Sequence, residues 1–208
     1  MKVDTMKVKL TGISPILGSI SMDKEIYTNF IAAKAKSVEE KKSADKMVEN
    51  VEDVEEKITG FYRDPDTKEI ILMGYEFKGF LKGAAKALKD QLKLGTPASK
   101  IDNYVFITEE SVPILVNGES VTKPDGYCER SLRCDTMQGP RTSLAKSEKI
   151  EKGWEATFTI SVVANSGTAK SVKVDLPLVE ELLDYGRLKG LLQWRNAGYG
   201  SFTWERVD

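Results

Sequence analysis

The residues best suited to bind an anionic polymer lie near the C-terminal end of the sequence, in the run GLLQWRNAGYG that begins at Gly190. Glycine permits positive φ and has no side chain to keep a ligand off the main chain, so exposed N–H groups can meet phosphate. Trp194 supplies an aromatic plane, Arg195 a charge for phosphate, and Asn196 an amide that can read a base edge. Together these residue types indicate nucleic-acid binding.

A second polar stretch, from residue 128 to residue 152, carries six basic and four acidic residues. Arginine binds phosphate oxygens through two parallel hydrogen bonds and stacks on bases, so its three arginines favour a binding surface shared with the glycine-rich run. The alternative is an ordinary hairpin connection with incidental charges. The candidate binding residues are Gly190, Trp194, Arg195, Asn196, Gly198, Tyr199, Gly200, Arg130, Arg133, Gln138, Arg141 and Lys146.

The elements on either side of the glycine-rich run must position it. Leucines and Val179 recur at three- and four-residue spacing with acidic residues on the other face, which predicts an amphipathic helix over 178–189 with Pro177 in its first turn. A closing strand is predicted over 199–207. A simpler interpretation of the glycines remains: Gly190 ends the helix, and a tight turn leads into an edge strand.

Six strong elements emerge when the whole chain is considered. Their order is βαββαβ, which is typical of an α+β, ferredoxin-like (RRM-like) fold with an antiparallel sheet and helices on one face. The stretches at about 22–73 and 95–126 are then β-rich or helical insertions. The six elements are a strand over 6–11, a helix over 75–94, strands over 127–134 and 154–163, a helix over 178–189 and a strand over 199–207.

Within the insertions, a hairpin is predicted around the turn at 64–67, and another around Asn117-Gly118. Residues 96–100 are predicted to be a linker, and residues 135–146 a loop. The stretch 23–57 holds ten acidic and seven basic residues, which is typical of a solvated helix or a disordered insertion.

The helix predicted over 75–94 carries a row of lysines, which is typical of a face exposed to solvent. The alternative is that these lysines form a surface that binds phosphate. These lysines are Lys78, Lys82, Lys86, Lys89 and Lys93.

The run GLLQWRNAGYG resembles the glycine-rich loop near the C-terminus of the RAMP superfamily, the RNA-binding Cas5, Cas6 and Cas7 subunits of CRISPR systems. That pattern is Gly-hydrophobic-Gly, five residues with a basic member, and Gly-hydrophobic-Gly. Gly190, Gly198 and Gly200 match it and Arg195 is the basic member, whereas Leu192 stands where the family has glycine. The segments TMQGPRTSLAKSE and DYGRLKGL also resemble sequences of phage-encoded proteins.

The resemblance implies a single RAMP-like domain over residues 1–208, closer to the Cas7-like or Cas5-like type than to Cas6. It also implies binding of single-stranded nucleic acid, RNA rather than DNA. Because the sequence has no histidine and no recognisable catalytic constellation, we expect binding without catalysis and without a cofactor. Copies would assemble along the strand or join a nucleoprotein complex, and no membrane would be involved. We expect a cytoplasmic location, in the host cytoplasm if the protein is phage-encoded.

Composition limits the chemistry. The formal net charge is −1, so a nucleic-acid site must be a local patch. The chain contains no histidine, which removes the usual general base and the histidine-based zinc motifs. One alternative is a metal-dependent ribonuclease of Cas7 type, with Asp23, Asp64 or Asp135 as the loop carboxylate. The other is a phage protein-interaction factor that imitates or inhibits a host defence complex.

Overall fold

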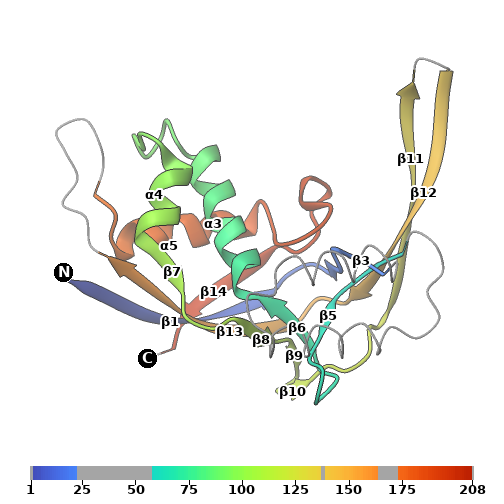
Figure 1. Ribbon diagram of the computed structural model, residues 1–208, viewed down its shortest axis with the longest axis horizontal. Helices are drawn as coiled ribbons and strands as arrows, with labels where there is room; N and C mark the ends of the chain where they lie inside the picture. The colour runs from blue at the N-terminus through green and yellow to red at the C-terminus, as the bar shows by residue number, and fades with distance from the viewer. Residues whose placement is uncertain (1, 23–57, 137–138, 164–172, 208) are drawn as a thin grey trace, which may run out of the picture.

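The computed structural model (Figure 1) describes residues 2–22, 58–136, 139–163 and 173–207; within 132–136 and 139–144 it describes the main chain alone. The fold is α+β, with mainly antiparallel sheets and, in the described ranges, three α-helices. None of these helices has both the length and the apolar character needed to cross a membrane. The acidic stretch 23–57 lies outside the described residues.

The largest sheet has the order β10-β9-β13-β1-β14, and β7 also pairs with β13. β1 and β13 form its centre and run antiparallel, with Val3 opposite Val163 and Thr11 opposite Glu155. Buried residues alternate along both strands, as the sequence predicts. The strands of this sheet are β1 (Val3–Gly12), β7 (Val105–Ile107), β9 (Leu115–Val116), β10 (Glu119–Ser120), β13 (Trp154–Val163) and β14 (Phe202–Arg206).

Figure 1 shows the helices α3 (Gly74–Ala87), α4 (Pro97–Tyr104) and α5 (Leu176–Asp184) gathered on one side of this sheet. α4 occupies the stretch that begins with the predicted linker, so that prediction is wrong. Pro97 lies in the first turn of α4, where its missing N–H leaves no hydrogen bond unmade.

The N-terminus of α5 is capped by Asp175, whose side chain accepts a hydrogen bond from the Leu178 N–H at 3.2 Å. The helix ends earlier than predicted, because Tyr185–Arg187 form a 3-10 turn. A Cβ atom on Gly186 would lie 2.3 Å from the ring of Phe202, so the chain bends where that ring needs room.

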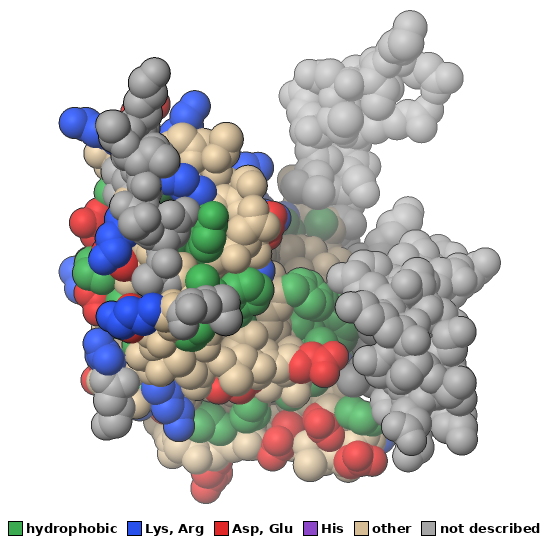
Figure 2. Space-filling model, turned by 60° about the vertical axis from the view of Figure 1, so that its left-hand side comes forward, with side chains coloured by type: hydrophobic (Ala, Val, Ile, Leu, Met, Phe, Trp, Pro, Cys, Tyr) green, Lys and Arg blue, Asp and Glu red, His purple; other side chains and the backbone are tan. Residues whose placement is uncertain are grey.

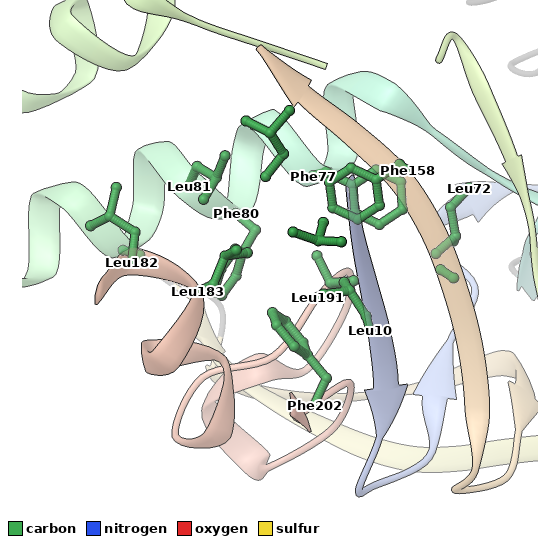
Figure 3. Packing of buried hydrophobic residues seen from close by; sticks show 14 of the residues in the cluster. Leu10, Leu72, Phe77, Phe80, Leu81, Phe158, Leu182, Leu183, Leu191 and Phe202 are labelled. Carbon is green, nitrogen blue, oxygen red and sulfur yellow. The ribbon is translucent and has the colours of Figure 1, made fainter. Parts of the chain in front are cut away.

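The core lies between the helices and the sheet, as Figure 3 shows. The rings of Phe77 and Phe158 stack with centroids 4.1 Å apart, and those of Phe80 and Phe202 meet at 5.0 Å. These contacts fasten α3 onto β13 and β14. Burying a phenylalanine contributes about 1.5–3 kcal/mol to the free energy of unfolding. The buried ring of Phe202 therefore anchors β14, the strand that follows the glycine-rich loop, in the core.

A second sheet is built around a long hairpin that projects from the body of the molecule (Figure 1). Its order is β11-β12-β4-β3, with β2 also paired to β12, and β12 with β4 is a parallel pair. These strands are β2 (Ile16–Leu17), β3 (Ile20–Ser21), β4 (Ile58–Gly60), β11 (Gly126–Thr136) and β12 (Gly139–Ile150).

Two predictions are wrong here. The stretch 127–134 is a strand, but it lies in this second sheet rather than the main one, where β7 pairs with β13 instead. The predicted loop at 135–146 belongs largely to β12. Both strands are rich in polar residues, so their alternation is weak, and only their mutual main-chain pairing reveals them.

The structure confirms both predicted hairpin turns, the first in a third, small sheet and the second between two strands of the largest sheet. The Asp64 carboxylate accepts from the N–H groups of Asp66 and Thr67, both at 2.9 Å, and so holds the first turn. Asn117 and Gly118 both have positive φ, at 54° and 82°, between β9 and β10. The small sheet contains β5 (Tyr62–Arg63), β6 (Ile70–Met73) and β8 (Ser111–Pro113).

Candidate nucleic-acid interface

The glycine-rich loop is closed at its base by two glycines whose main chains touch. A Cβ atom on Gly190 would lie 2.0 Å from the carbonyl carbon of Gly200. The Leu191 N–H donates to the Gly200 carbonyl at 2.9 Å, and the Gly200 N–H donates to the Pro15 carbonyl at 2.8 Å. These glycines therefore permit close packing of main chain on main chain, and neither of the two amides is open to a ligand.

The tip of the loop has an unusual backbone. Leu192 and Trp194 have positive φ, at 59° and 53°, and Gly198 follows at 86°. A left-handed conformation costs a non-glycine residue about 1–2 kcal/mol, so the surrounding contacts must hold the loop in this shape. Leu192 is partly buried against the core. Asn196 and Gly198 are exposed.

Arg130 of β11 meets the tip of the loop. Its guanidinium carbon lies 4.2 Å from the centroid of the Trp194 ring, which is the geometry of a cation–π contact. Tyr199 approaches Trp194 edge-on, with ring centroids 5.9 Å apart and planes at 72°. All three side chains are half-buried. We refer to Arg130, Trp194 and Tyr199 as the Trp194 platform.

The strand register of the hairpin explains why Arg130 faces the loop. Residues directly opposite in an antiparallel pair share a face, and successive residues alternate between faces. Cys128 pairs with Ser147, and the next residue, Glu129, pairs with Lys146. Cys128, Arg130 and Ser147 therefore lie on the face toward the loop, and Glu129 and Lys146 lie on the other.

Cys128 of β11 contacts the Trp194 platform through Tyr199. Its Sγ atom lies 3.3 Å from the Tyr199 hydroxyl. This hydrogen bond raises the pKa of Tyr199 above its usual value of 10.0, and burial acts in the same direction. The phenol is therefore neutral at physiological pH and remains able to exchange a hydrogen bond with Cys128.

Gln193 ties the loop to the second sheet. Its Oε1 atom accepts a hydrogen bond from the Ser147 hydroxyl at 3.1 Å and lies 3.4 Å from the Thr59 hydroxyl. The two hydroxyl oxygens are 2.7 Å apart. Three elements, the loop, β12 and β4, thus meet at one side-chain amide.

Arg195 lies over helix α3. One of its terminal nitrogens is 3.8 Å from the position that a Cβ atom on Gly83 would occupy. Among the described residues, no carboxylate forms an ion pair with Arg195.

The remaining predicted residues are not gathered at the platform. Lys146 lies on the opposite face of the hairpin, 3.7 Å from the Glu129 carboxylate and 4.8 Å from the centroid of the Tyr127 ring. Arg133 and Arg141 are placed only by strand register, since their side chains are outside the description, and Gln138 is outside it altogether.

Three residues outside the loop contact it directly although nothing in their types or spacing marks them. Only the pairing of β11 with β12 and of β12 with β4 brings them to the loop. They are Thr59, Cys128 and Ser147, and the loop residue Gln193, which was not among the predicted binding residues, receives two of these contacts.

The described residues include no group of three or more cysteine and carboxylate side chains arranged to hold a metal ion. Asp64, one of the three carboxylates considered for the nuclease alternative, uses its side chain in the turn between β5 and β6. Asp23 and the side chain of Asp135 lie outside the description.

Charge is unevenly distributed on the surface that Figure 2 shows. Lysine and arginine side chains predominate on the left of that view, and acidic side chains gather at the lower right. A net charge near zero therefore conceals local patches of either sign.

Comparisons with known proteins find similarity at the level of structure alone. No protein-family model matches the sequence, and no curated protein matches it. One chain of the cryo-EM structure of the Type III-B Cmr-beta bound to cognate target RNA is similar over 100% of this chain, with a TM-score of 0.46 and 12% sequence identity. This chain spans 61% of the length of that one.

Proposed function

We propose that the chain binds single-stranded nucleic acid, RNA in preference to DNA, without acting on it chemically. The observation that carries the proposal is the Arg130 guanidinium on the Trp194 ring at 4.2 Å, with Tyr199 beside it. Stacking of a base on an aromatic side chain contributes about 1–3 kcal/mol and tolerates any base. A guanidinium stacked on a ring still presents its N–H edge to phosphate.

The charges around the platform support an anionic ligand. Arg195 has no carboxylate partner among the described residues, whereas Lys149, on the same face of the hairpin as Arg130, is paired with Glu151 at 2.5 Å. The preference for RNA is supported by the resemblance of GLLQWRNAGYG to the RAMP loop. Because the contacts to phosphate release counterions, affinity should fall as the salt concentration rises.

The proposal includes a ferredoxin-like core of β1, α3, β7, β13, α5 and β14. It is supported by the antiparallel order β14-β1-β13-β7 and by the position of α3 and α5 between those strands along the chain. In such a core the glycine-rich loop joins the second helix to the last strand. The β11–β12 hairpin is then an insertion that carries half of the platform.

The test is a fluorescence anisotropy titration of labelled single-stranded RNA, single-stranded DNA and double-stranded RNA at low salt. We expect single-stranded RNA to bind most tightly, and Arg130→Ala to weaken that binding about tenfold, which is about 1.4 kcal/mol. Arg195→Ala should lower the slope of log affinity against log salt by about one.

Arg206→Ala is the matched control, since Arg206 is an exposed arginine on β14 outside the platform. It should bind as the unmodified protein does. Absence of binding to every oligonucleotide, or equal weakening by Arg130→Ala and Arg206→Ala, would overturn the proposal.

A further inference from the structure

The row of lysines along helix α3 divides into two parts. Lys78 donates to the Asp102 carbonyl at 3.0 Å, and Lys82 forms an ion pair with the Asp102 carboxylate at 2.7 Å, so both fasten α3 to α4. Lys86 is exposed, and no carboxylate in the described part of the chain forms an ion pair with it. The side chain of Lys86 therefore has no part in joining the two helices.

Lys86 belongs to a face of α3 that has little side-chain cover. Residues three or four positions apart are neighbours on a helix surface, so Lys86 shares its face with Gly83, Gly79 and Tyr75. A Cβ atom on Gly79 would have nothing within 4 Å, and one on Gly83 would meet only a terminal nitrogen of Arg195, at 3.8 Å. Tyr75 is 44% exposed. The main chain of the helix is thus open to a ligand between Tyr75 and Lys86.

Arg195 connects this face to the Trp194 platform. The Trp194 ring lies against the Arg130 guanidinium of the hairpin, and the next side chain along the loop, that of Arg195, lies over Gly83 of α3. The glycine-rich loop therefore reaches the hairpin through one residue and α3 through the next (Figure 1). A strand with one base on the Trp194 ring would have its adjacent phosphates near Arg195, beside the exposed face of the helix.

We propose that this face of α3 is a second contact surface for the strand that the Trp194 platform binds, an inference that rests on the proposed function. Its occupant is the sugar–phosphate backbone: Arg195 and Lys86 pair with phosphates, and a further base stacks on the exposed ring of Tyr75. Charge complementarity favours this occupant, because the stretch 86–93 holds three lysines and one acidic residue. The two glycines let the backbone of the strand lie close to the helix.

The test is a fluorescence anisotropy titration of labelled single-stranded RNA of about twelve nucleotides, long enough to extend beyond the platform. Lys86→Glu should weaken binding about fivefold or more, because the reversed charge repels phosphate. Lys123→Glu is the matched control. It makes the same charge change at an exposed lysine in the loop between β10 and β11, and should weaken binding less than about twofold. Lys86→Ala should lower the slope of log affinity against log salt by about one.

Gly79→Gln tests whether the backbone of the strand approaches the helix. The new side chain enters open space, and glutamine favours a helix more than glycine does, so the free energy of unfolding should not fall. Binding of the same RNA should nevertheless weaken about fivefold or more, because the strand can no longer lie close to the main chain. A loss of affinity without a loss of stability distinguishes contact with the strand from a role in folding.

The inference is overturned if Lys86→Glu binds the RNA no more weakly than Lys123→Glu, or if Gly79→Gln binds it as tightly as the unmodified protein does. The proposed function would stand in that case, provided that Arg130→Ala still weakens binding. If the unmodified protein binds no single-stranded RNA, the function and the inference fail together.

Discussion

Gly190 and Gly200 lie where a side chain cannot fit, and Gly198 lies where only the backbone conformation favours glycine. The positions of the glycines are given by the sequence, but which of them permit close packing and which permit a left-handed backbone cannot be predicted from it. Whether a glycine serves packing or a ligand depends on the segment that reaches it. At the base of the loop that segment is the other end of the loop itself, because Gly190 packs on Gly200 and Gly200 packs on Leu191. The Gly200 N–H is in addition taken by the Pro15 carbonyl, about 185 positions away along the chain.

Alanine substitutions should separate these roles. Gly190→Ala should lower the free energy of unfolding by about 3 kcal/mol or more, because the added Cβ meets the carbonyl carbon of Gly200 and both main chains must shift. Gly198→Ala should cost about 1 kcal/mol, because nothing lies within 4 Å and only its φ of 86° is unfavourable. Urea denaturation measures both, and equal losses would contradict this account of the loop.

At the scale of the elements, strong apolar periodicity predicts β1, β13, α3 and α5, although both helices end before the predicted residue. The polar strands β11 and β12 are the exception. They contain Arg130, Ser147 and Cys128, and their register decides which of these side chains face the loop. Register depends on pairing partners distant in sequence, so the contacts of the Trp194 platform could not be predicted from the composition of that stretch.

Helix α3 offers a test of local stability. Gly79 lies inside the helix, is exposed, and has nothing within 4 Å of the position a Cβ would take. Glycine inside a helix is less favourable than alanine by about 0.5–1 kcal/mol. Gly79→Ala should therefore raise the free energy of unfolding by about that amount in a urea titration. An unchanged or lower free energy of unfolding would show that the absence of a side chain at Gly79 is itself needed for stability.

The turn between β5 and β6 should make stability depend on pH at its acidic end. Hydrogen bonds from the main chain, first that of Thr67, lower the pKa of Asp64 below its usual 3.8. A lowered folded-state pKa stabilises the protein above the unfolded-state value, and this contribution disappears as pH falls through the folded-state value.

Asp64→Ala should therefore be less stable than the unmodified protein at pH 7, by less than about 1 kcal/mol because the carboxylate is largely solvated. The difference should shrink as pH falls below 3.8. Thermal unfolding of both proteins across this range measures it. A difference that does not change with pH would exclude the charged form as the cause.

At the scale of the whole molecule, one sheet covered by three helices holds one end of the glycine-rich loop, and a second sheet built on a long hairpin meets its tip. The sequence predicts the α+β class, but it places 127–134 in the wrong sheet because β7, the strand that pairs with β13, has three residues and little periodic signal. The proposed binding surface exists only where the two sheets meet.

The most direct test of the central claim is photo-crosslinking of the protein to a single-stranded RNA that contains 4-thiouridine, followed by trypsin digestion and mass spectrometry. We predict crosslinks at Trp194 and Tyr199, in the adjacent peptides 190–195 and 196–206. They should decrease as salt rises and when Arg130 is replaced by alanine. Crosslinks confined to other surfaces, such as the outer face of β1 and β13, with these two peptides unmodified, would contradict the claim.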